Sequence, residues 1–171
     1  MLLWEWESEN LPEEFRKYAS LYREAMNSNN PNYQFLCYYK IIEGLLKRRD
    51  RIIKEAVQRG ETIPSQLRQL IPQTPAEQLN WLNTIFATPW EHDDLAFSMI
   101  FPATSLGRKV RDIVQNELVS IRNKIAHSVL DGGEPTFSID HGPDIEELLM
   151  WLPLAKCIAR LYMKNEFPGT F

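Results

Sequence analysis

The chain has 171 residues, of which 44% are hydrophobic and 25% are charged, and its formal net charge at pH 7 is −4. This length fits one domain with a substantial core, and the composition excludes disorder over most of the chain. The two cysteines exclude a disulfide framework, and no apolar run reaches the roughly 20 residues that span a bilayer. Met1–Trp6 carries acidic residues where a secretion signal needs a basic start, so we expect a cytoplasmic protein.

The first part of the chain predicts two helices. Apolar periodicity and acidic residues near the start favour a helix over about 11–27, which the polar residues 27–32 end. A long helix follows over about 33–59, and Gly60 is typical of a residue that ends a helix.

The apolar residues of this long helix recur at helical spacing on one face and then extend well beyond that face. A helix that is apolar over so wide an arc is usually buried on two sides. A second copy of the chain or a central place in the core would each explain the pattern. The residues concerned are Phe35, Tyr38, Tyr39, Ile41, Ile42, Leu45 and Leu46.

Prolines interrupt the next stretch, which predicts short helices over about 65–70, 75–86 and 91–99. A second long helix is expected over about 105–126, where apolar residues recur at steps of three or four. Residues 136–140 alternate weakly and predict a short extended segment. The last helix should run from 143 or 144 to about 164, with Pro153 introducing a kink or marking its true start.

Basic residues concentrate on the two long helices, although the whole chain is acidic. Seven basic residues stand against three acidic ones from 40 to 59, and five stand against two from 104 to 127. Such a local excess can support a phosphate-binding surface, whereas solvated helix faces would give the same pattern. Both explanations fit the sequence.

The residues with the clearest chemical potential are Arg122, Asn123 and His127, near the end of the second long helix. Histidine has an unperturbed pKa of about 6.5, so near neutrality it can take a proton from a ribose 2′-hydroxyl. The 2′-oxygen then attacks the adjacent phosphate. A guanidinium can hold the phosphorane that forms, and Asn123 could orient the histidine or a phosphate oxygen, without a metal. On an ideal helix Arg122 and His127 differ by about 140°, so from the spacing alone the default explanation is a helix-terminal histidine that caps carbonyls beside a solvated arginine.

Residues 121–128, Ile-Arg-Asn-Lys-Ile-Ala-His-Ser, resemble the motif of the HEPN superfamily: an arginine, four to six further residues and a histidine, often with a polar residue directly after the arginine. Residues 33–45 are similar to a helix upstream of that motif in HEPN-like proteins, including some labelled methylamine-utilisation proteins. The two segments cover well under half of the chain. The resemblance implies an all-α, HEPN-like helical bundle over residues 1–171, with two long central helices and a Pro-rich helical insert over about 61–103.

The resemblance also implies a function. HEPN domains commonly dimerise, and active members cut RNA without metal or another cofactor in a cleft that both copies share. In such a cleft the angle of about 140° between Arg122 and His127 on one helix would not prevent them from acting together, because the site is assembled from two copies. Arg122, Asn123 and His127 would then be catalytic in a homodimer. Lys124, Arg111 and Arg108 would bind the RNA.

Many HEPN domains are toxins or defence effectors, some with an antitoxin protein as partner, and others only bind. The alternative is therefore a non-catalytic module that binds a partner protein, a nucleotide or RNA. The third possibility is a helical bundle in which Arg122 and His127 have no part in any function.

Other candidate residues have structural interpretations. His92 and His141 lack the spacing of metal ligands, so we expect no metal site. Glu43 could contact Arg122 if the two long helices pack together, although a structural ion pair is its expected use. Cys37 and Cys157 are expected as buried, reduced thiols.

Overall fold

The computed structural model describes residues 11–62, 69–86, 94–130 and 142–170, and these residues form an all-α fold. Within them no strand forms, and the one bridge of β type joins Leu70 to Lys109. None of the described helices is long and apolar enough to cross a bilayer. The elements are α1 (Glu13–Asn27), α2 (Pro31–Gln58), α3 (Pro75–Ile85), α4 (Asp94–Ile100), the 3-10 turn η1 (Ala103–Ser105), α5 (Val110–Ile113), the π-helical turn η2 (Val114–Leu118), α6 (Val119–Leu130) and α7 (Gly142–Glu166).

The ends of α2 follow from local sequence. The Asn30 side chain accepts a hydrogen bond from the backbone N–H of Tyr33 at 3.2 Å, and Pro31 occupies the first turn, where a missing N–H costs nothing. After the helix, Gly60 adopts φ +75°, the left-handed conformation that favours glycine. The helix predicted over 33–59 is therefore confirmed, with its start two residues earlier.

The start of the second long helix was predicted wrongly. Residues 105–109 are not part of a long helix, because the backbone N–H of Ile71 donates to the Arg108 carbonyl at 2.8 Å and Gly107 N–H donates to the Ile71 carbonyl at 2.9 Å. Gly107 adopts φ +71° to allow this pairing. The last helix, predicted from 143 or 144 to about 164, is confirmed as α7, which begins at Gly142 and continues through Pro153, so this proline does not mark its start.

Parts of the chain lie outside the described residues. These include most of the helix predicted over 65–70, whose last two residues, 69 and 70, are not helical. The extended segment predicted over 136–140, His92 and His141 also lie outside them.

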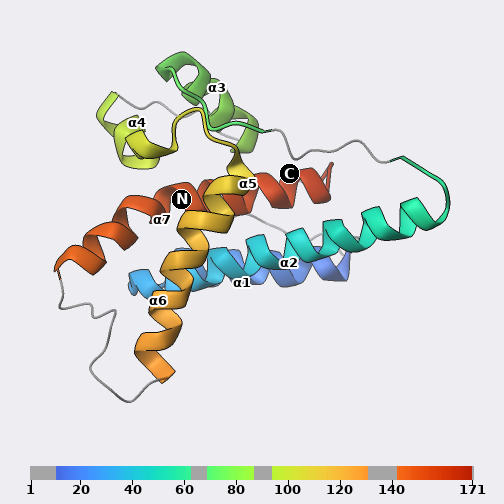
Figure 1. Ribbon diagram of the computed structural model, residues 1–171, viewed down its shortest axis with the longest axis horizontal. Helices are drawn as coiled ribbons and strands as arrows, with labels where there is room; N and C mark the ends of the chain where they lie inside the picture. The colour runs from blue at the N-terminus through green and yellow to red at the C-terminus, as the bar shows by residue number, and fades with distance from the viewer. Residues whose placement is uncertain (1–10, 63–68, 87–93, 131–141, 171) are drawn as a thin grey trace.

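Helix α2 lies at the centre of the molecule. Figure 1 shows α1 and α2 side by side, α7 running along α2, and α5, η2 and α6 crossing these helices as one rod. Helices α3 and α4 pack on α7, away from α1 and α2. Phe35, Ile41, Ile42 and Leu45 are all buried in this arrangement. The central position thus explains the wide apolar arc of α2 without a second copy of the chain.

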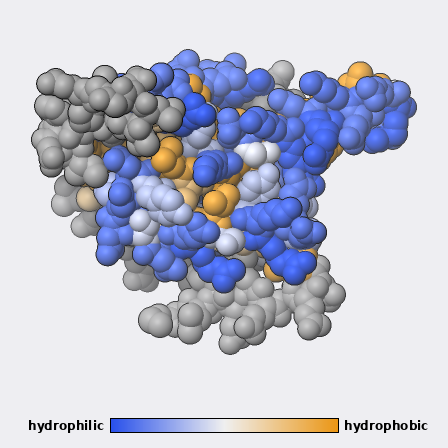
Figure 2. Space-filling view, turned by 90° about the horizontal axis from the view of Figure 1, so that it is seen from below, coloured by the Kyte–Doolittle hydropathy of each residue, from blue (hydrophilic) through white to orange (hydrophobic). Residues whose placement is uncertain are grey.

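The outer surface is mainly hydrophilic. Figure 2 shows this for the face seen from below, where apolar residues reach the surface in patches near the centre and in a few smaller spots toward the edge. This distribution is ordinary for a folded domain, in which scattered apolar side chains remain exposed.

A buried arginine connects the insert to the rest of the bundle. The Arg160 side chain on α7 is only 3% exposed, and its Nε donates to the Ile85 carbonyl at 3.0 Å at the end of α3. Its guanidinium lies 5.7 Å from the centroid of the Tyr22 ring on α1 and 5.2 Å from that of Phe86. Hydrogen bonds and aromatic faces of this kind compensate the cost of burying the charge.

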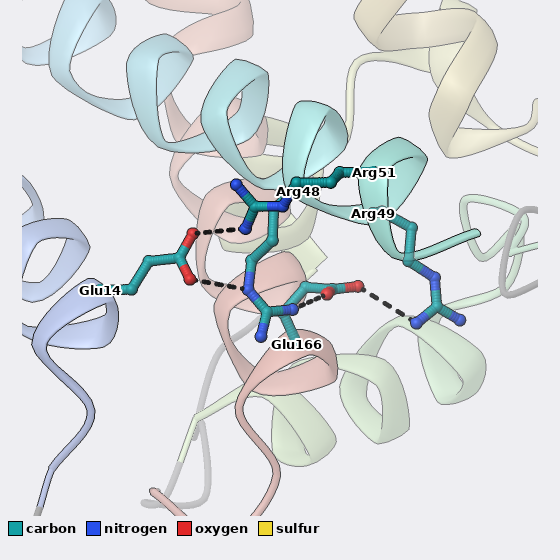
Figure 3. A network of polar contacts seen from close by, with 5 residues as sticks. All are labelled: Glu14, Arg48, Arg49, Arg51 and Glu166. Carbon is teal, nitrogen blue, oxygen red and sulfur yellow. Dashed lines mark hydrogen bonds and ion pairs between the residues drawn. The ribbon is translucent and has the colours of Figure 1, made fainter. Parts of the chain in front are cut away.

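An ion-pair cluster joins α1, α2 and α7 (Figure 3). Arg48 Nε lies 3.1 Å from Glu14 Oε2, and its Nη1 lies 2.6 Å from Glu166 Oε2. Arg49 Nη1 approaches the other Glu166 oxygen at 3.6 Å, and Arg51 Nη2 approaches Glu14 Oε1 at 3.8 Å. The Glu166 side chain is only 6% exposed, so its charge depends on these arginines.

Replacing Arg48 with alanine should lower the free energy of unfolding by about 3 kcal/mol, because Glu166 keeps only the longer contact to Arg49. Urea denaturation followed by circular dichroism measures this. The matched control is Lys17→Ala, which breaks the Lys17–Glu13 pair, whose side chains are 71% and 76% exposed. The control should change stability by less than about 0.5 kcal/mol. Equal losses in the two variants would show that the cluster contributes no more than a surface pair.

Candidate functional site

The predicted site residues lie on the rod that α5, η2 and α6 form (Figure 1). One side of this rod faces the core along its whole described length. Val110, Val114, Leu118, Ile121 and Ile125 are all buried, as their spacing predicts. The residues between them are left to face solvent or neighbouring helices.

The π turn η2 sets the rotation of α6. On an ideal α-helix, each four-residue step from Val110 to Val114 and from there to Leu118 would turn the apolar stripe by about 40°. The wider turn of η2, with its longer hydrogen-bonded repeat, compensates for this rotation of the apolar stripe and returns Leu118 to the core side. The two successive four-residue steps were the signal for this turn in the sequence, whereas a regular helix was predicted there. The directions of Arg122 and His127 depend on it.

Arg122 is exposed on α6 and is held in place by neutral groups. Its Nη1 donates to Asn123 Oδ1 at 3.0 Å, and its guanidinium lies 6.0 Å from the centroid of the Tyr39 ring on α2. Burial raises the pKa of the Tyr39 hydroxyl, so this ring is neutral near pH 7. Among the described residues no carboxylate lies within ion-pair distance of Arg122, and Glu43 instead pairs with Lys47 at 3.5 Å. Most of the five N–H donors of a guanidinium are therefore available to an anion.

His127 is also exposed, but it does not share a face with Arg122. Helix α6 continues to Leu130, so the expected helix end at Ala126 was wrong and regular helical spacing applies. Arg122 and His127 then differ by about 140°, whereas Asn123 and His127, four residues apart, are neighbours on one face. Asn123 thus stands between the arginine that it contacts and the histidine one turn later.

The three residues expected to bind RNA have different surroundings. Lys124 forms a short ion pair with Glu147 on α7, and Arg108 Nη1 lies 2.8 Å from Glu117 Oε1. Arg111 is exposed, and it lies 11 residues before Arg122, or about 16 Å along an ideal helix. The structure therefore groups Asn123 with Arg122, while Arg111 and Arg108 lie near the other end of the rod.

The described residues contain no group of three or more histidine, cysteine or acidic side chains that could hold a metal ion. Cys37 and Cys157 are free and buried, as the sequence predicts. Burial raises the pKa of the Cys157 thiol to about 12, which keeps it protonated and unreactive near neutrality.

Comparison with known proteins gives one match. The model of a family described as "Methylamine utilization protein MauJ" matches residues 18–164, from α1 to nearly the end of α7. This confirms the similarity to methylamine-utilisation proteins that residues 33–45 indicate. No curated protein and no solved structure matches the chain.

The π turn can be tested by deletion. Removing the exposed residue Asn116 should convert η2 into an ordinary helical turn, since Val110 and Leu118 would then be seven residues apart and nearly aligned. We expect a loss of stability of no more than about 1–2 kcal/mol, measured by thermal and urea denaturation.

The matched control is deletion of Lys40, an exposed residue in the regular helix α2. That deletion turns the following residues by about 100° relative to the core and should abolish folding. If both deletions are equally damaging, η2 does not act as a one-residue insertion.

Proposed function

We propose that this chain, which belongs to the MauJ family, is a HEPN-type endoribonuclease that acts as a homodimer and needs no metal. The observation that carries the proposal is the setting of Arg122: an exposed guanidinium with no carboxylate partner among the described residues, bonded to Asn123 on the helix that also bears exposed His127. A guanidinium in this setting is suited to phosphate oxygens. The HEPN resemblance of residues 121–128 gives the same three residues a common role.

In the proposed reaction His127 takes the proton of a ribose 2′-hydroxyl, and the 2′-oxygen attacks the adjacent phosphorus. Arg122 stabilises the negative charge of the phosphorane, and Asn123 keeps the guanidinium in place through its 3.0 Å hydrogen bond. The bond to the 5′-oxygen then breaks, and the protonated His127 returns its proton to the 5′-oxygen. The products are a 2′,3′-cyclic phosphate and a 5′-hydroxyl, and neither step requires a metal.

A second copy of the chain supplies what one helix lacks. A single α6 presents Arg122 and His127 about 140° apart, so the two side chains do not face one phosphate from the same helix. The end of α6 that carries His127 projects beyond α1 and α2 (Figure 1). In a two-fold dimer, Arg122 of one copy and His127 of the other would meet at a shared cleft, and the same pairing would occur twice.

The alternative is a non-catalytic module that binds RNA, a nucleotide or a partner protein. A specific observation favours it: Lys124 and Arg108 are committed to ion pairs with Glu147 and Glu117, which leaves fewer cations for an RNA strand. RNA binding that Arg122→Ala weakens, without cleavage in the wild type, would support this function instead.

The toxin or defence role is tested in cells. Expression that slows growth in the wild type but not with Arg122→Ala would support a toxic nuclease, and an antitoxin would then be sought as a partner. Growth that is unaffected by wild-type expression would count against a toxin.

The central prediction is cleavage of RNA in excess chelator, with loss of rate by about 100-fold or more in both Arg122→Ala and His127→Ala. Gel electrophoresis and analysis of the new RNA ends measure the rate and identify the products. The matched control is Arg16→Ala, which removes an exposed arginine from α1 and should leave the rate unchanged. Intact RNA in the wild-type reactions, across several substrates, would overturn the enzymatic proposal.

Mixing two inactive variants tests the shared cleft. After exchange of subunits between Arg122→Ala and His127→Ala, half of the dimers are mixed and each mixed dimer has one complete Arg122–His127 pair, so about a quarter of the wild-type rate should return. Each variant alone, taken through the same exchange, is the control. No recovery from a mixture that demonstrably forms mixed dimers would show that both residues act from one chain.

A further inference from the structure

A narrow cavity lies at the other end of the rod from Arg122. It has a volume of about 40 Å³ and is bounded by α2, the start of α5, the end of α7 and residue 69. A water molecule needs roughly 10–15 Å³ measured in this way, so the cavity has room for a slim group of several atoms. None of its lining residues belongs to the proposed catalytic set Arg122, Asn123 and His127, although Arg111 is also one of the residues expected to bind RNA.

The walls of the cavity are mainly aliphatic. Leu45, Leu46 and Ile53 line it from α2, and Val110 lines it from α5. The wall is fixed in place because Val110 N–H donates to the Gln69 carbonyl at 2.9 Å. These groups favour contact with a hydrocarbon chain over contact with water.

Positive charge gathers at the edge of the same cavity. Arg49 and Arg111 line it from α2 and α5. Arg49 shares the carboxylate of Glu166, whereas among the described residues no carboxylate lies within ion-pair distance of Arg111. The exposed guanidinium of Arg111 is therefore available to an anion that enters the cavity.

Tyr162 adds a neutral donor. It lines the cavity from α7, and its hydroxyl forms no hydrogen bond with the described part of the chain. Burial raises the pKa of this hydroxyl to about 12, so it keeps its proton near pH 7 and can donate to an anion.

We propose that this cavity binds a small organic carboxylate with a slim, unbranched hydrocarbon chain. The carboxylate would lie between Arg111 and Tyr162, and the chain would lie along the leucine and isoleucine side chains of α2. The charge of the ligand follows from the surroundings: two guanidinium groups disfavour a cation, and Glu166 at the edge disfavours a dianion such as a phosphate monoester. The proposal does not depend on RNA cleavage, because binding is measured without RNA.

Isothermal titration calorimetry of the full chain with acetate, butyrate and hexanoate tests the proposal. Affinity should rise along the series by about fourfold for each methylene that the walls bury. Three compounds serve as controls: hexanol lacks the carboxylate, hexylamine carries the opposite charge, and inorganic phosphate lacks the hydrocarbon chain. Each should bind at least about tenfold more weakly than hexanoate. Equal affinity for hexanoate and any of these three, or no saturable binding of hexanoate at millimolar concentration, would overturn the proposal.

Variants locate the binding. Arg111→Gln should weaken hexanoate binding by about tenfold or more, as expected for the loss of one charge-assisted hydrogen bond. Ile53→Phe narrows the cavity from a half-buried position and should reduce the affinity for hexanoate more than that for acetate. The matched control Arg16→Gln removes an exposed arginine elsewhere and should leave the affinity unchanged. Unaltered hexanoate binding in folded Arg111→Gln and Ile53→Phe, with unchanged melting temperatures, would place the ligand elsewhere and refute this site.

Discussion

The nearly buried carboxylate of Glu166 constrains the whole bundle. A charge in that position is stable only if cations reach it, and Arg48 and Arg49 do so from the middle of α2. Because Arg48 also pairs with Glu14 on α1, the cluster connects α1, α2 and α7. With α2 fixed, its first half presents the Tyr39 ring to Arg122, and its second half forms a wall of the carboxylate cavity.

The basic excess on the two long helices has a third explanation that neither earlier interpretation included. Arg48, Arg49 and Lys124 pair with carboxylates on other helices, so part of the positive charge holds helices together. Composition alone cannot reveal this, because the partner acids lie far away in sequence. Arg122 is among the cations that no ion pair of the described residues engages, and the motif of residues 121–128 places it five residues before His127.

The parts of the fold that local chemistry decides could be predicted from the sequence. The limits of α2 follow from the Asn30 cap and from Gly60, and the buried stripe of the rod follows from its apolar spacing. Residues 105–109 were predicted as helix because their pairing with residues 69–71 is a long-range contact that leaves no periodic trace. Gly107 was the one local sign, since its positive φ allows the chain to leave the helical path.

The residues of the candidate site come from the sequence motif and stay a prediction, whereas their geometry comes from the structure. The motif identifies Arg122, Asn123 and His127, and the structure adds the hydrogen bond and the aromatic contact that position Arg122. The rotation of α6 depends on η2, whose single extra residue changes the direction of every later side chain by about 100° relative to an uninterrupted helix.

The two proposed sites share the rod but not its residues. Near α5 the rod is fixed by backbone hydrogen bonds to residues 69–71, and at α6 it is fixed by the ion pair between Lys124 and Glu147. Neither Arg111 nor Arg122 takes part in those attachments. Replacing either arginine leaves those attachments in place, and Arg122→Ala removes only the hydrogen bond to Asn123 and the 6.0 Å contact with the Tyr39 ring on α2. If the melting temperature is unchanged, the loss of either binding function can be attributed to the missing guanidinium and not to a displaced helix.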